Sequence, residues 1–489
     1  MRQSRYASPQ IIEEILLTTP TLTIKHILSV SIMAISACQS QMAIRPVSDL
    51  PPGVAGVWQS DGYGYVLDAT GEFPRLFHHT PEFCIEDKET SAALSNYLVP
   101  ENLKFSADGG KLFFAPTFEE YPMSMNGLKS RPPACGMAVS GDPETTFESF
   151  ASYMASHYAF FDLYDVDWDA SIAAVRPRVS KDMSEADLYQ IFEELLAPIG
   201  DGHLTLEAEL DGDEAIINPG ISTVGQALKR IAARDGTSEQ KLNNQMMRQY
   251  WMSGIRKGVL GGKGKMVAND FIQYGIVSGD IGYIAFATEA GYAGEGLFAE
   301  EDDLAVLCET LDAAITKFNE ASVKAVIIDM SVNFGGYDFV SREIAERFAT
   351  QPSLAYSKYA ADSTIRTPFE IRITPHDGIR YRGPVVLVTT NVTVSAGEML
   401  TMALRSQPNV IHVGETTRGA HSDVLTKKLP NGWTLNLSNE VYHDHEGNFL
   451  EKLGIAPHQP IQIFDLENPF TGHVEAIAQI VDDIITRVD

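Results

Sequence analysis

The 489-residue sequence predicts a mixed α/β fold of several domains, and three changes in its pattern indicate this class. Short apolar runs separated by glycine-containing turns fill residues 50–138, which is typical of a small antiparallel β domain. From residue 142 apolar side chains recur every three or four positions, the period of a helix. After residue 275 strand and helix patterns alternate, which favours a mainly parallel sheet covered by helices.

Residues 1–38 have the pattern of an export signal. Lys25 precedes an apolar stretch, residues 27–34, that is too short to span a bilayer, and small residues then lead to Cys38. This arrangement resembles the signal of bacterial lipoproteins, whose cysteine is lipidated and becomes the new N-terminus. It implies a location outside the cytoplasm, in the periplasm or at the outer membrane, with a lipid anchor at Cys38. A plain secretory signal and a buried helix are the alternatives.

The remaining cysteines are interpreted in the light of export. Cys84 and Cys135 flank a stretch rich in glycine, proline and aromatic residues, and they are candidates for a disulfide in an oxidising compartment. Cys308 lies in a helical pattern and is expected to be a buried apolar side chain. No CxxC pair occurs, so we expect no cysteine-rich zinc site.

Three further segments complete the predicted organisation. Residues 142–205 form a helical subdomain, residues 206–275 a helical insertion or linker, and residues 276–489 the strand–helix core. With 44% hydrophobic residues the chain can bury a large core. The net charge of −28 argues against nucleic acid as a partner, because phosphate binding requires a basic surface.

Ser395 is the candidate nucleophile. An apolar strand, residues 385–389, runs through a small-residue turn into a helix that starts near Glu398. This layout places a serine hydroxyl beside the free N–H groups and positive end of a helix, where an oxyanion can be stabilised. The turn has Thr393 where the G-x-S-x-G elbow has its first glycine. The alternative is an ordinary helix N-cap formed by the serine side chain.

A glycine pair follows the strand at residues 324–329. Gly335 and Gly336 lie where the strand ends, so backbone N–H groups can face a bound carbonyl without an intervening side chain. We expect the N–H groups of Gly336 and Ala396 to form an oxyanion hole, with Gly335 in support. A tight turn that only requires positive φ is the alternative.

Several short motifs occur together in a characteristic order. They are Gly-Tyr-Ile at 282–284, the segments 329–336 and 393–398, Gly-Glu-Thr-Thr-Arg-Gly at 414–419, and Gly-Ile-Ala-Pro at 454–457. In order and spacing the set resembles the tail-specific (C-terminal processing) peptidases of family S41, over about residues 145–205 and 275–465. The resemblance implies a crotonase/ClpP-like ββα core preceded by a helical subdomain.

The family has two kinds of active site, and the sequence favours one of them. In the Ser-Lys branch the base is a lysine that corresponds to Ala420 here, so that base is missing. Lys427 and Lys428 follow in a predicted strand, where we expect a solvated pair.

In the other branch, similar to the tricorn core and the retinoid-binding-protein-like peptidases, a histidine of the helical subdomain activates the serine. The resemblance of the 201–203 Asp-Gly-His turn implies that His203 is this base. An imidazole can take the serine proton and return it to the leaving amine. From the residues alone, an exposed or capping histidine is the alternative.

The third member implied by the resemblance is Glu451, an acidic residue ahead of the 454–457 segment that would orient the imidazole or its partner. A surface glutamate is equally compatible with the pattern. His458 and Ser331 depart from the family's aspartate and arginine at their positions. The His443-Asp444-His445 segment could offer two imidazoles to a metal, but it runs into a turn between exposed strands, so we expect solvated residues and no metal site.

Together these patterns predict an exported, lipid-anchored serine peptidase that acts on a peptide or protein substrate and needs no cofactor. A catalytically silent protein that binds a peptide or apolar ligand on the same fold is the first alternative. A crotonase-like acyl-CoA enzyme is the second, and export argues against it.

Overall fold

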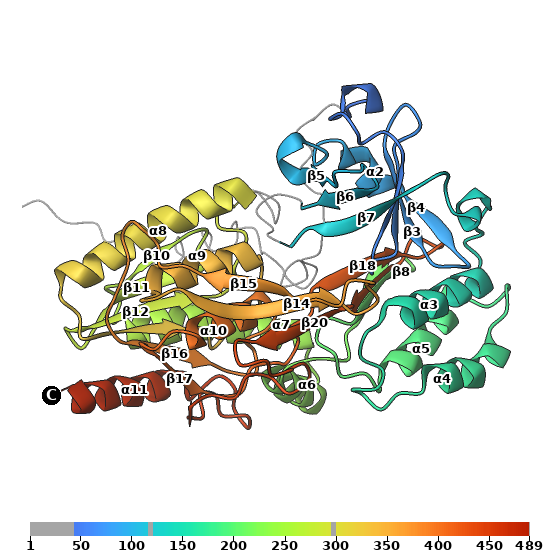
Figure 1. The fold of residues 1–489 in the computed structure, drawn as a ribbon. Coiled ribbons are helices and arrows are strands. Elements are labelled where there is room, and N and C mark those ends of the chain that lie inside the picture. Colours follow the sequence, from blue (N-terminus) through green and yellow to red (C-terminus); the bar gives the residue numbers. More distant parts are fainter. Residues whose placement is uncertain (1–43, 116–120, 295–299, 489) are drawn as a thin grey trace, which may run out of the picture.

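The computed structural model describes residues 44–115, 121–294 and 300–488 (Figure 1). The predicted signal segment and Cys38 lie outside these residues. Among the described helices, none combines the length and the apolar character needed to cross a bilayer. The mixed α/β, multidomain architecture is the class that the sequence predicts.

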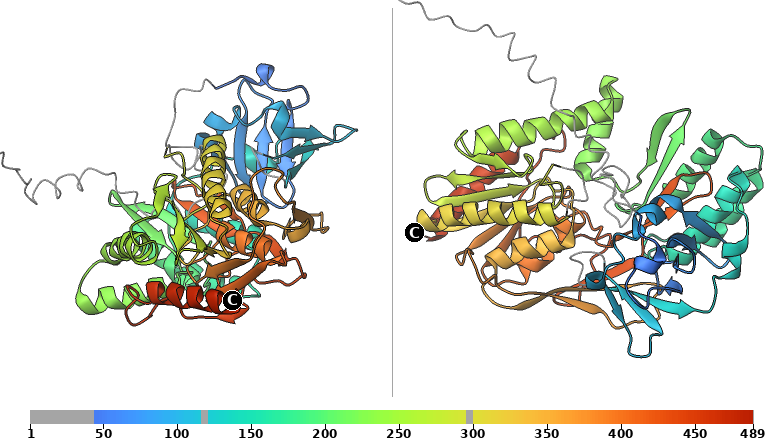
Figure 2. Two further views of the ribbon diagram at one scale, coloured as in Figure 1. Left: turned by 90° about the vertical axis from the view of Figure 1, so that its left-hand side faces the viewer. Right: turned by 90° about the horizontal axis from the view of Figure 1, so that it is seen from above.

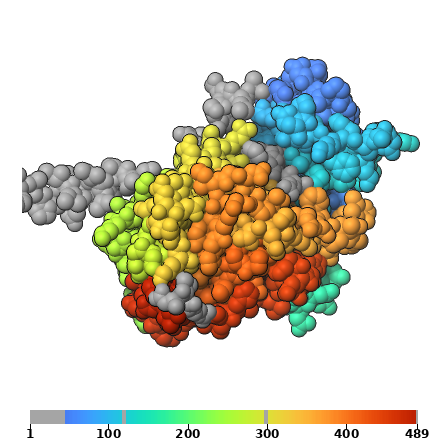
Figure 3. All heavy atoms as spheres, turned by 60° about the vertical axis from the view of Figure 1, so that its left-hand side comes forward, coloured from blue at the N-terminus to red at the C-terminus, as the bar shows by residue number. Residues whose placement is uncertain are grey.

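The N-terminal β domain, residues 44–138, is one antiparallel sheet with the strand order β4-β3-β2-β1-β7-β6-β5. Asp87 starts its helix by accepting the N–H of Thr90. A disulfide joins Cys84 on β4 to Cys135. In space-filling view the domain stands as a lobe on the rest of the molecule (Figure 3). The elements are β1 (Val57–Ser60), β2 (Tyr65–Asp68), β3 (Arg75–His79), β4 (Cys84–Asp87), α2 (Lys88–Leu94), β5 (Leu103–Phe105), β6 (Lys111–Phe114) and β7 (Met123–Leu128).

Three amphipathic helices follow, namely α3 (Pro143–His157), α4 (Trp168–Val175) and α5 (Glu185–Leu196). Asp142, Asp167 and Ser184 cap their N-termini through side-chain oxygens. The aromatic face of α3 packs on α5, with the Phe150 and Phe192 rings 4.1 Å apart. This helical part lies beside the N-terminal β domain (Figure 1).

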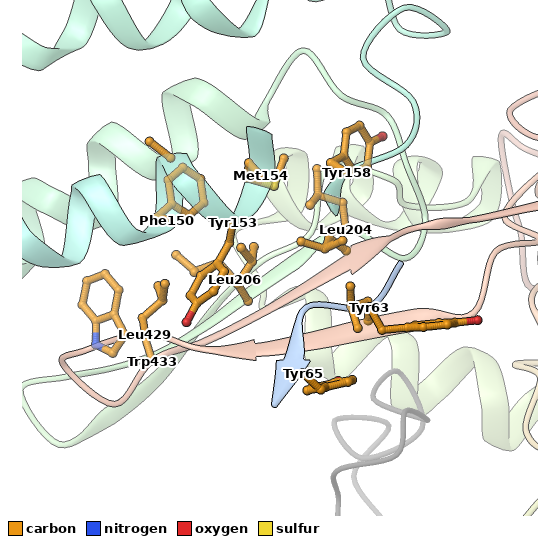
Figure 4. Close-up of a cluster of buried hydrophobic side chains, with 14 of the residues drawn as sticks. Tyr63, Tyr65, Phe150, Tyr153, Met154, Tyr158, Leu204, Leu206, Leu429 and Trp433 are labelled. Carbon is orange, nitrogen blue, oxygen red and sulfur yellow. The ribbon is translucent and has the colours of Figure 1, made fainter. Parts of the chain in front are cut away.

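A four-stranded antiparallel sheet connects these parts, in the order β18-β19-β8-β9. Its strands are β8 (Thr205–Leu210), β9 (Asp213–Ile217), β18 (Val424–Lys428) and β19 (Thr434–Ser438). Their apolar side chains share one core with α3 and the N-terminal β domain (Figure 4). The prediction of a helical segment over residues 206–275 is therefore wrong for its first part, and also for its last part, where the strands Lys265–Val267 and Ile272–Val277 lie. Asp211 and Gly212, both with positive φ, form the tight turn of a hairpin.

The α/β core is a sheet in the order β10-β11-β12-β13-β16-β17-β21 with helices on both faces (Figure 2). From β12 to β21 the strands are parallel. The strands are β10 (Lys265–Val267), β11 (Ile272–Val277), β12 (Ile281–Phe286), β13 (Ala325–Asp329), β16 (Val385–Thr389), β17 (Val410–Gly414) and β21 (Gln459–Pro460).

One face of this sheet packs against α8 (Glu300–Glu320), α9 (Asp338–Phe348) and α10 (Ala396–Arg405). The other face packs against α6 (Thr223–Asp235), α7 (Glu239–Arg248), the π-helical η6 (Gln249–Val259) and α11 (His473–Val488). A small sheet in the order β15-β14-β20 flanks the core, formed by β14 (Ser353–Ala360), β15 (Phe369–Ile373) and β20 (Glu440–Asp444). Because β13 and β16 are adjacent and parallel, the turns that leave their carboxyl ends lie side by side.

Candidate active site

Ser395 stands at the end of the turn between β16 and α10, in a strained backbone conformation. Its φ of 58° and ψ of −129° are rare for a residue with a side chain. Its hydroxyl makes no capping bond to the helix, so the alternative of a side-chain N-cap is wrong. The backbone N–H of Ser395 donates to the carbonyl of Ala420 at 3.2 Å. The hydroxyl is therefore not committed to holding the helix and remains available for chemistry.

Two threonine hydroxyls hold the turn that carries Ser395. Thr390 donates to the carbonyl of Ser331 at 2.6 Å, and Thr393 donates to that of Met330 at 2.7 Å. Both acceptors belong to the turn after β13. Threonine at 393, where a hydrolase elbow has glycine, thus serves to fasten the two turns to each other. These bonds supply the surrounding structure that a strained residue requires.

The second turn brings glycine against the serine. Gly335 has a φ of 78°, and a Cβ added to it would lie 2.6 Å from Ser395 Cβ. Asn333 fixes this turn by accepting the N–H of Gly335 at 2.9 Å and donating to Glu289 Oε1 at 2.9 Å. A Cβ on Gly336 would lie 2.4 Å from the carbonyl carbon of Glu289. At both positions neighbouring atoms come so close that there is no room for a side chain, so glycine is required.

Two backbone N–H groups remain available next to Ser395. Among the described residues, neither the N–H of Gly336 nor that of Ala396 donates to a protein acceptor. Ala396 is the first residue of α10, so the positive end of the helix adds to its field. The Ala396 nitrogen lies 3.1 Å from the position that a Cβ on Gly335 would take. Such a pair of donors can stabilise the oxyanion that forms on a substrate carbonyl when Ser395 attacks it.

The turn that carries His203 approaches the loop at Ala420 from the helical part. Asp201 Oδ1 accepts the His203 N–H at 2.8 Å, and Asp201 Oδ2 accepts the Tyr158 hydroxyl at 3.0 Å. A Cβ on Gly202 would lie 3.0 Å from Ala420 Cβ, and Ala420 is the residue whose carbonyl binds the Ser395 N–H. The two predicted stretches therefore both contact Ala420.

The electrostatic surroundings favour a neutral His203. Burial lowers the pKa of this imidazole, and the nearby carboxylates of Asp201 and Glu398 offset part of that effect. Its Nδ1 has no protein partner among the described residues. A neutral imidazole is the form that can accept a proton.

Ala420 stands at the position that corresponds to the lysine of the Ser-Lys arrangement. Ala420 is fully buried, and its small side chain leaves the room that the Gly202 turn fills. Lys427 is buried rather than solvated, so the predicted solvated pair is wrong: its Nζ donates to the carbonyls of Tyr63 at 2.6 Å and Gly64 at 3.1 Å. These acceptors belong to the N-terminal β domain, which covers β18. Lys428 pairs with Glu89 at 3.6 Å.

Glu451 is buried, and it contacts His421. Its Oε2 accepts the N–H groups of His421 at 2.9 Å and Ser422 at 3.2 Å, and it lies 3.6 Å from His421 Nδ1. Burial raises the pKa of Glu451 to about 7. The reading of Glu451 as a surface residue is therefore wrong, although the hydrogen bonds of its Oε2 run to His421 and Ser422 rather than to His203.

His421 is the site residue that sequence reasoning missed. Its ring lies between Glu451 and Glu398, with Nε2 3.5 Å from Glu398 Oε1. Burial opposes its positive charge, but the two carboxylates outweigh burial and raise its pKa. Glu398 also accepts the Thr417 hydroxyl at 2.6 Å and the N–H groups of Gly419 and Ala420 at 2.7 and 2.9 Å. Two buried carboxylates, Glu398 and Glu451, thus hold the loop that contains Ala420.

His443 lies near the end of β20, and His445 lies in the turn that follows this strand. Asp444 there closes a turn by accepting the N–H groups of Glu446 and Asn448. Over the described part of the chain, no group of three or more histidine, cysteine or acidic side chains is arranged to hold a metal ion.

Two family profiles and several known proteins match parts of this chain. The profile of peptidase family S41 matches residues 281–461, and that of the tricorn protease C1 domain matches residues 142–197. A Chlamydia pneumoniae protein is 24% identical over 197 residues, which is 38% of this chain and 28% of that protein. The chain matches between 24% and 28% of the length of such curated relatives.

Solved structures show the same fold. A candidate peptidase from Parabacteroides merdae superposes with a TM-score of 0.53 at 22% identity, over 70% of this chain and 97% of that one. Mature CPAF, in a complex with lactacystin, gives a TM-score of 0.51 at 13% identity, over 71% of this chain and 98% of that one. The matched S41 region contains both turns at Ser395, and the C1 region ends just before the His203 turn.

Proposed function

We propose that this chain, which belongs to peptidase family S41, is an exported serine peptidase that cleaves peptide bonds by acyl transfer through Ser395 and His203. The observation that carries the proposal is the meeting of two distant turns on Ala420, beside two unengaged N–H groups. A hydroxyl, an imidazole and an oxyanion hole are the parts that acyl transfer requires.

The proposed reaction proceeds in two halves. Ser395 Oγ attacks the substrate carbonyl carbon while His203 takes the hydroxyl proton, and the N–H groups of Gly336 and Ala396 stabilise the oxyanion. The C–N bond then breaks as His203 returns the proton to the leaving amine, which leaves an ester on Ser395. Water, deprotonated by His203, attacks this ester, and the proton returns to Ser395 as the acid product leaves.

Glu451 and His421 act as positioning residues in this scheme. The pair holds the loop that contains Ala420, and this loop contacts both the serine turn and the His203 turn. Their substitution is expected to reduce kcat more than it changes KM, because the alignment of the serine and the imidazole is lost rather than substrate contacts.

The location outside the cytoplasm rests on the signal-like residues 1–38 and on the Cys84–Cys135 disulfide, since disulfides persist in oxidising compartments. We propose that Cys38 carries the lipid anchor. Labelling of cells with an alkyne fatty acid tests this proposal. Wild type should incorporate the label and Cys38→Ser should not, whereas equal labelling of both would contradict the anchor.

A fluorophosphonate probe combined with a peptide library tests the mechanism. Wild type should be labelled and should cleave peptides, and Ser395→Ala should do neither. His203→Ala should reduce both strongly while the protein stays folded. Ser406→Ala, at the other end of α10, is the matched control and should behave as wild type. A folded wild-type protein without labelling or cleavage would instead favour the catalytically silent binding protein.

A further inference from the structure

A cavity of about 200 Å³ lies between the N-terminal β domain and the α/β core. Its walls come from strands and helix α2 of the N-terminal β domain, from β18 and β20, and from the turn at Gly336. Figure 4 shows two of its tyrosines, Tyr63 just before β2 and Tyr65 at the start of β2, beside the four-stranded sheet. The regions matched by known families, residues 142–197 and 281–461, do not include the N-terminal wall.

We propose that this cavity binds a large uncharged apolar side chain of the peptide substrate, on the acyl side of the cleaved bond, so that the N-terminal β domain sets selectivity. The inference rests on the proposed peptidase function and adds a substrate class to it.

The cavity is continuous with the candidate active site through Gly336. Gly336 lines the cavity, and the same residue offers its N–H to the oxyanion. Tyr337 and Asp338, the next two residues, also line it. Because neighbouring residues of a chain are 3.8 Å apart, a peptide with its carbonyl at Gly336 has a side chain within reach of the cavity.

The size of the cavity and the chemistry of its walls suit a large apolar side chain. The N-terminal wall is apolar, with Leu67, Leu76, Leu94, Met123 and Met125 among its residues. A cavity of about 150 Å³ with such walls holds a benzene ring, so this one has room for an aromatic or long aliphatic side chain. Apolar clefts with few polar groups are the usual form of ligand sites.

The charged residues of the cavity argue against an acidic occupant. Lys358 Nζ is paired with Asp423 at 2.6 Å and with Glu440 at 3.3 Å, and it donates to the Tyr442 hydroxyl at 2.9 Å. Glu440 also accepts the Tyr63 hydroxyl. The lysine is therefore already neutralised, and an acidic side chain would meet the remaining carboxylates. Burying a further charge without a partner is unfavourable.

The N-terminal wall is held firmly against the core. Lys427 binds the carbonyls of Tyr63 and Gly64, and the Tyr65 hydroxyl donates to the Thr426 carbonyl at 3.2 Å. On the other side, Asp61 accepts the Ser363 hydroxyl at 2.7 Å. These bonds hold the wall in place without ligand, so little ordering is required when a side chain enters.

The test uses the full chain and a peptide series in which only the residue on the acyl side of the cut varies. Wild type should favour Phe, Leu or Met over Ala by about 10- to 100-fold in kcat/KM, from the apolar surface buried. It should disfavour Asp more strongly. Leu67→Trp fills the cavity and should reduce the preference for Phe at least about fivefold, as the bound ring loses part of its room.

Tyr97→Ala provides a second variant at a half-buried position of the wall, in case Leu67→Trp does not fold. It should also weaken the preference. Met247→Ala is the matched control, because Met247 lines a separate cavity next to Phe334 and Val394. The substrate preference of this variant should equal that of wild type.

Fluorophosphonate labelling of Ser395 distinguishes failure of the proposed peptidase function from failure of the cavity assignment. Loss of wild-type labelling would overturn the proposed function itself. Normal labelling with no preference for large apolar residues, or a preference that changes with Met247→Ala and not with the wall variants, would overturn only the assignment of this cavity.

Discussion

Replacement of Glu398 by alanine should destabilise the protein and abolish hydrolysis together. The carboxylate is fully buried and accepts three donors, the Thr417 hydroxyl and the N–H groups of Gly419 and Ala420. Each buried donor left without an acceptor costs about 1–2 kcal/mol after local relaxation, so the free energy of unfolding should fall by about 3–6 kcal/mol. His421 also loses one of its two carboxylate partners.

The consequence for activity follows from the same loop. Ala420 touches the Gly202 turn with its side chain and the Ser395 N–H with its carbonyl. When the loop loses its central acceptor, the spacing between the serine and the imidazole is no longer held, and a misplacement of about 1 Å can cost about 100-fold in rate.

Urea unfolding followed by fluorescence, together with peptide hydrolysis, measures both effects. Glu398→Gln keeps one acceptor oxygen but turns an amide group toward an N–H donor, so its stability should lie between those of alanine and wild type. Glu309→Ala, an exposed glutamate on α8, is the control and should change stability by less than about 0.5 kcal/mol. A loss below about 1 kcal/mol for Glu398→Ala, with activity retained, would refute the idea that this carboxylate organises the site.

Three further outcomes are expected. Gly335→Ala should reduce kcat/KM at least about 100-fold with the fold retained by circular dichroism, since its Cβ would lie 2.6 Å from Ser395 Cβ; wild-type activity would contradict the arrangement. Burial raises the pKa of Glu289 from 4.5 to about 8, so the folded state keeps a proton that the unfolded chain loses, and the stability contributed by this group falls as pH rises between these values. Glu289→Gln should therefore match wild type near pH 5 and exceed it by roughly 3–5 kcal/mol at pH 9 in urea unfolding, and an equal difference at both pH values would refute the shift. Removal of both Cys84 and Cys135 should lower the unfolding free energy by about 4 kcal/mol, because the disulfide closes a loop over a separation of 51 residues and reduces the entropy of the unfolded chain. An unchanged urea midpoint would show that the disulfide contributes nothing.

Local patterns predicted much of the fold because they act over a few residues. The strand–helix alternation after residue 275 corresponds to β12, β13, β16 and β17 with their helices. The turn at Ser395 and the glycine pair at Gly335 were visible as breaks between an apolar run and a helix. The Asp211-Gly212 turn carried an equally local signal, and the hairpin of β8 and β9 was predictable from it.

Contacts between distant segments were not predictable in this way. Nothing near Lys427 in the sequence indicates that carbonyl groups of the N-terminal β domain, 364 residues away, bind its ammonium group. His421 likewise has its partners on α10 and in the loop at Glu451, so no short motif marks it.

The sequence by itself determined where strands end, where helices begin and which residue types stand at those ends, because backbone sterics and hydrophobic periodicity are properties of neighbouring residues. Tertiary structure alone decided that the His203 turn packs on Ala420, that His421 lies between two carboxylates and that an apolar cavity opens at Gly336. These features depend on how separate elements pack around shared cores, and that packing depends on side-chain shape and burial across the whole chain.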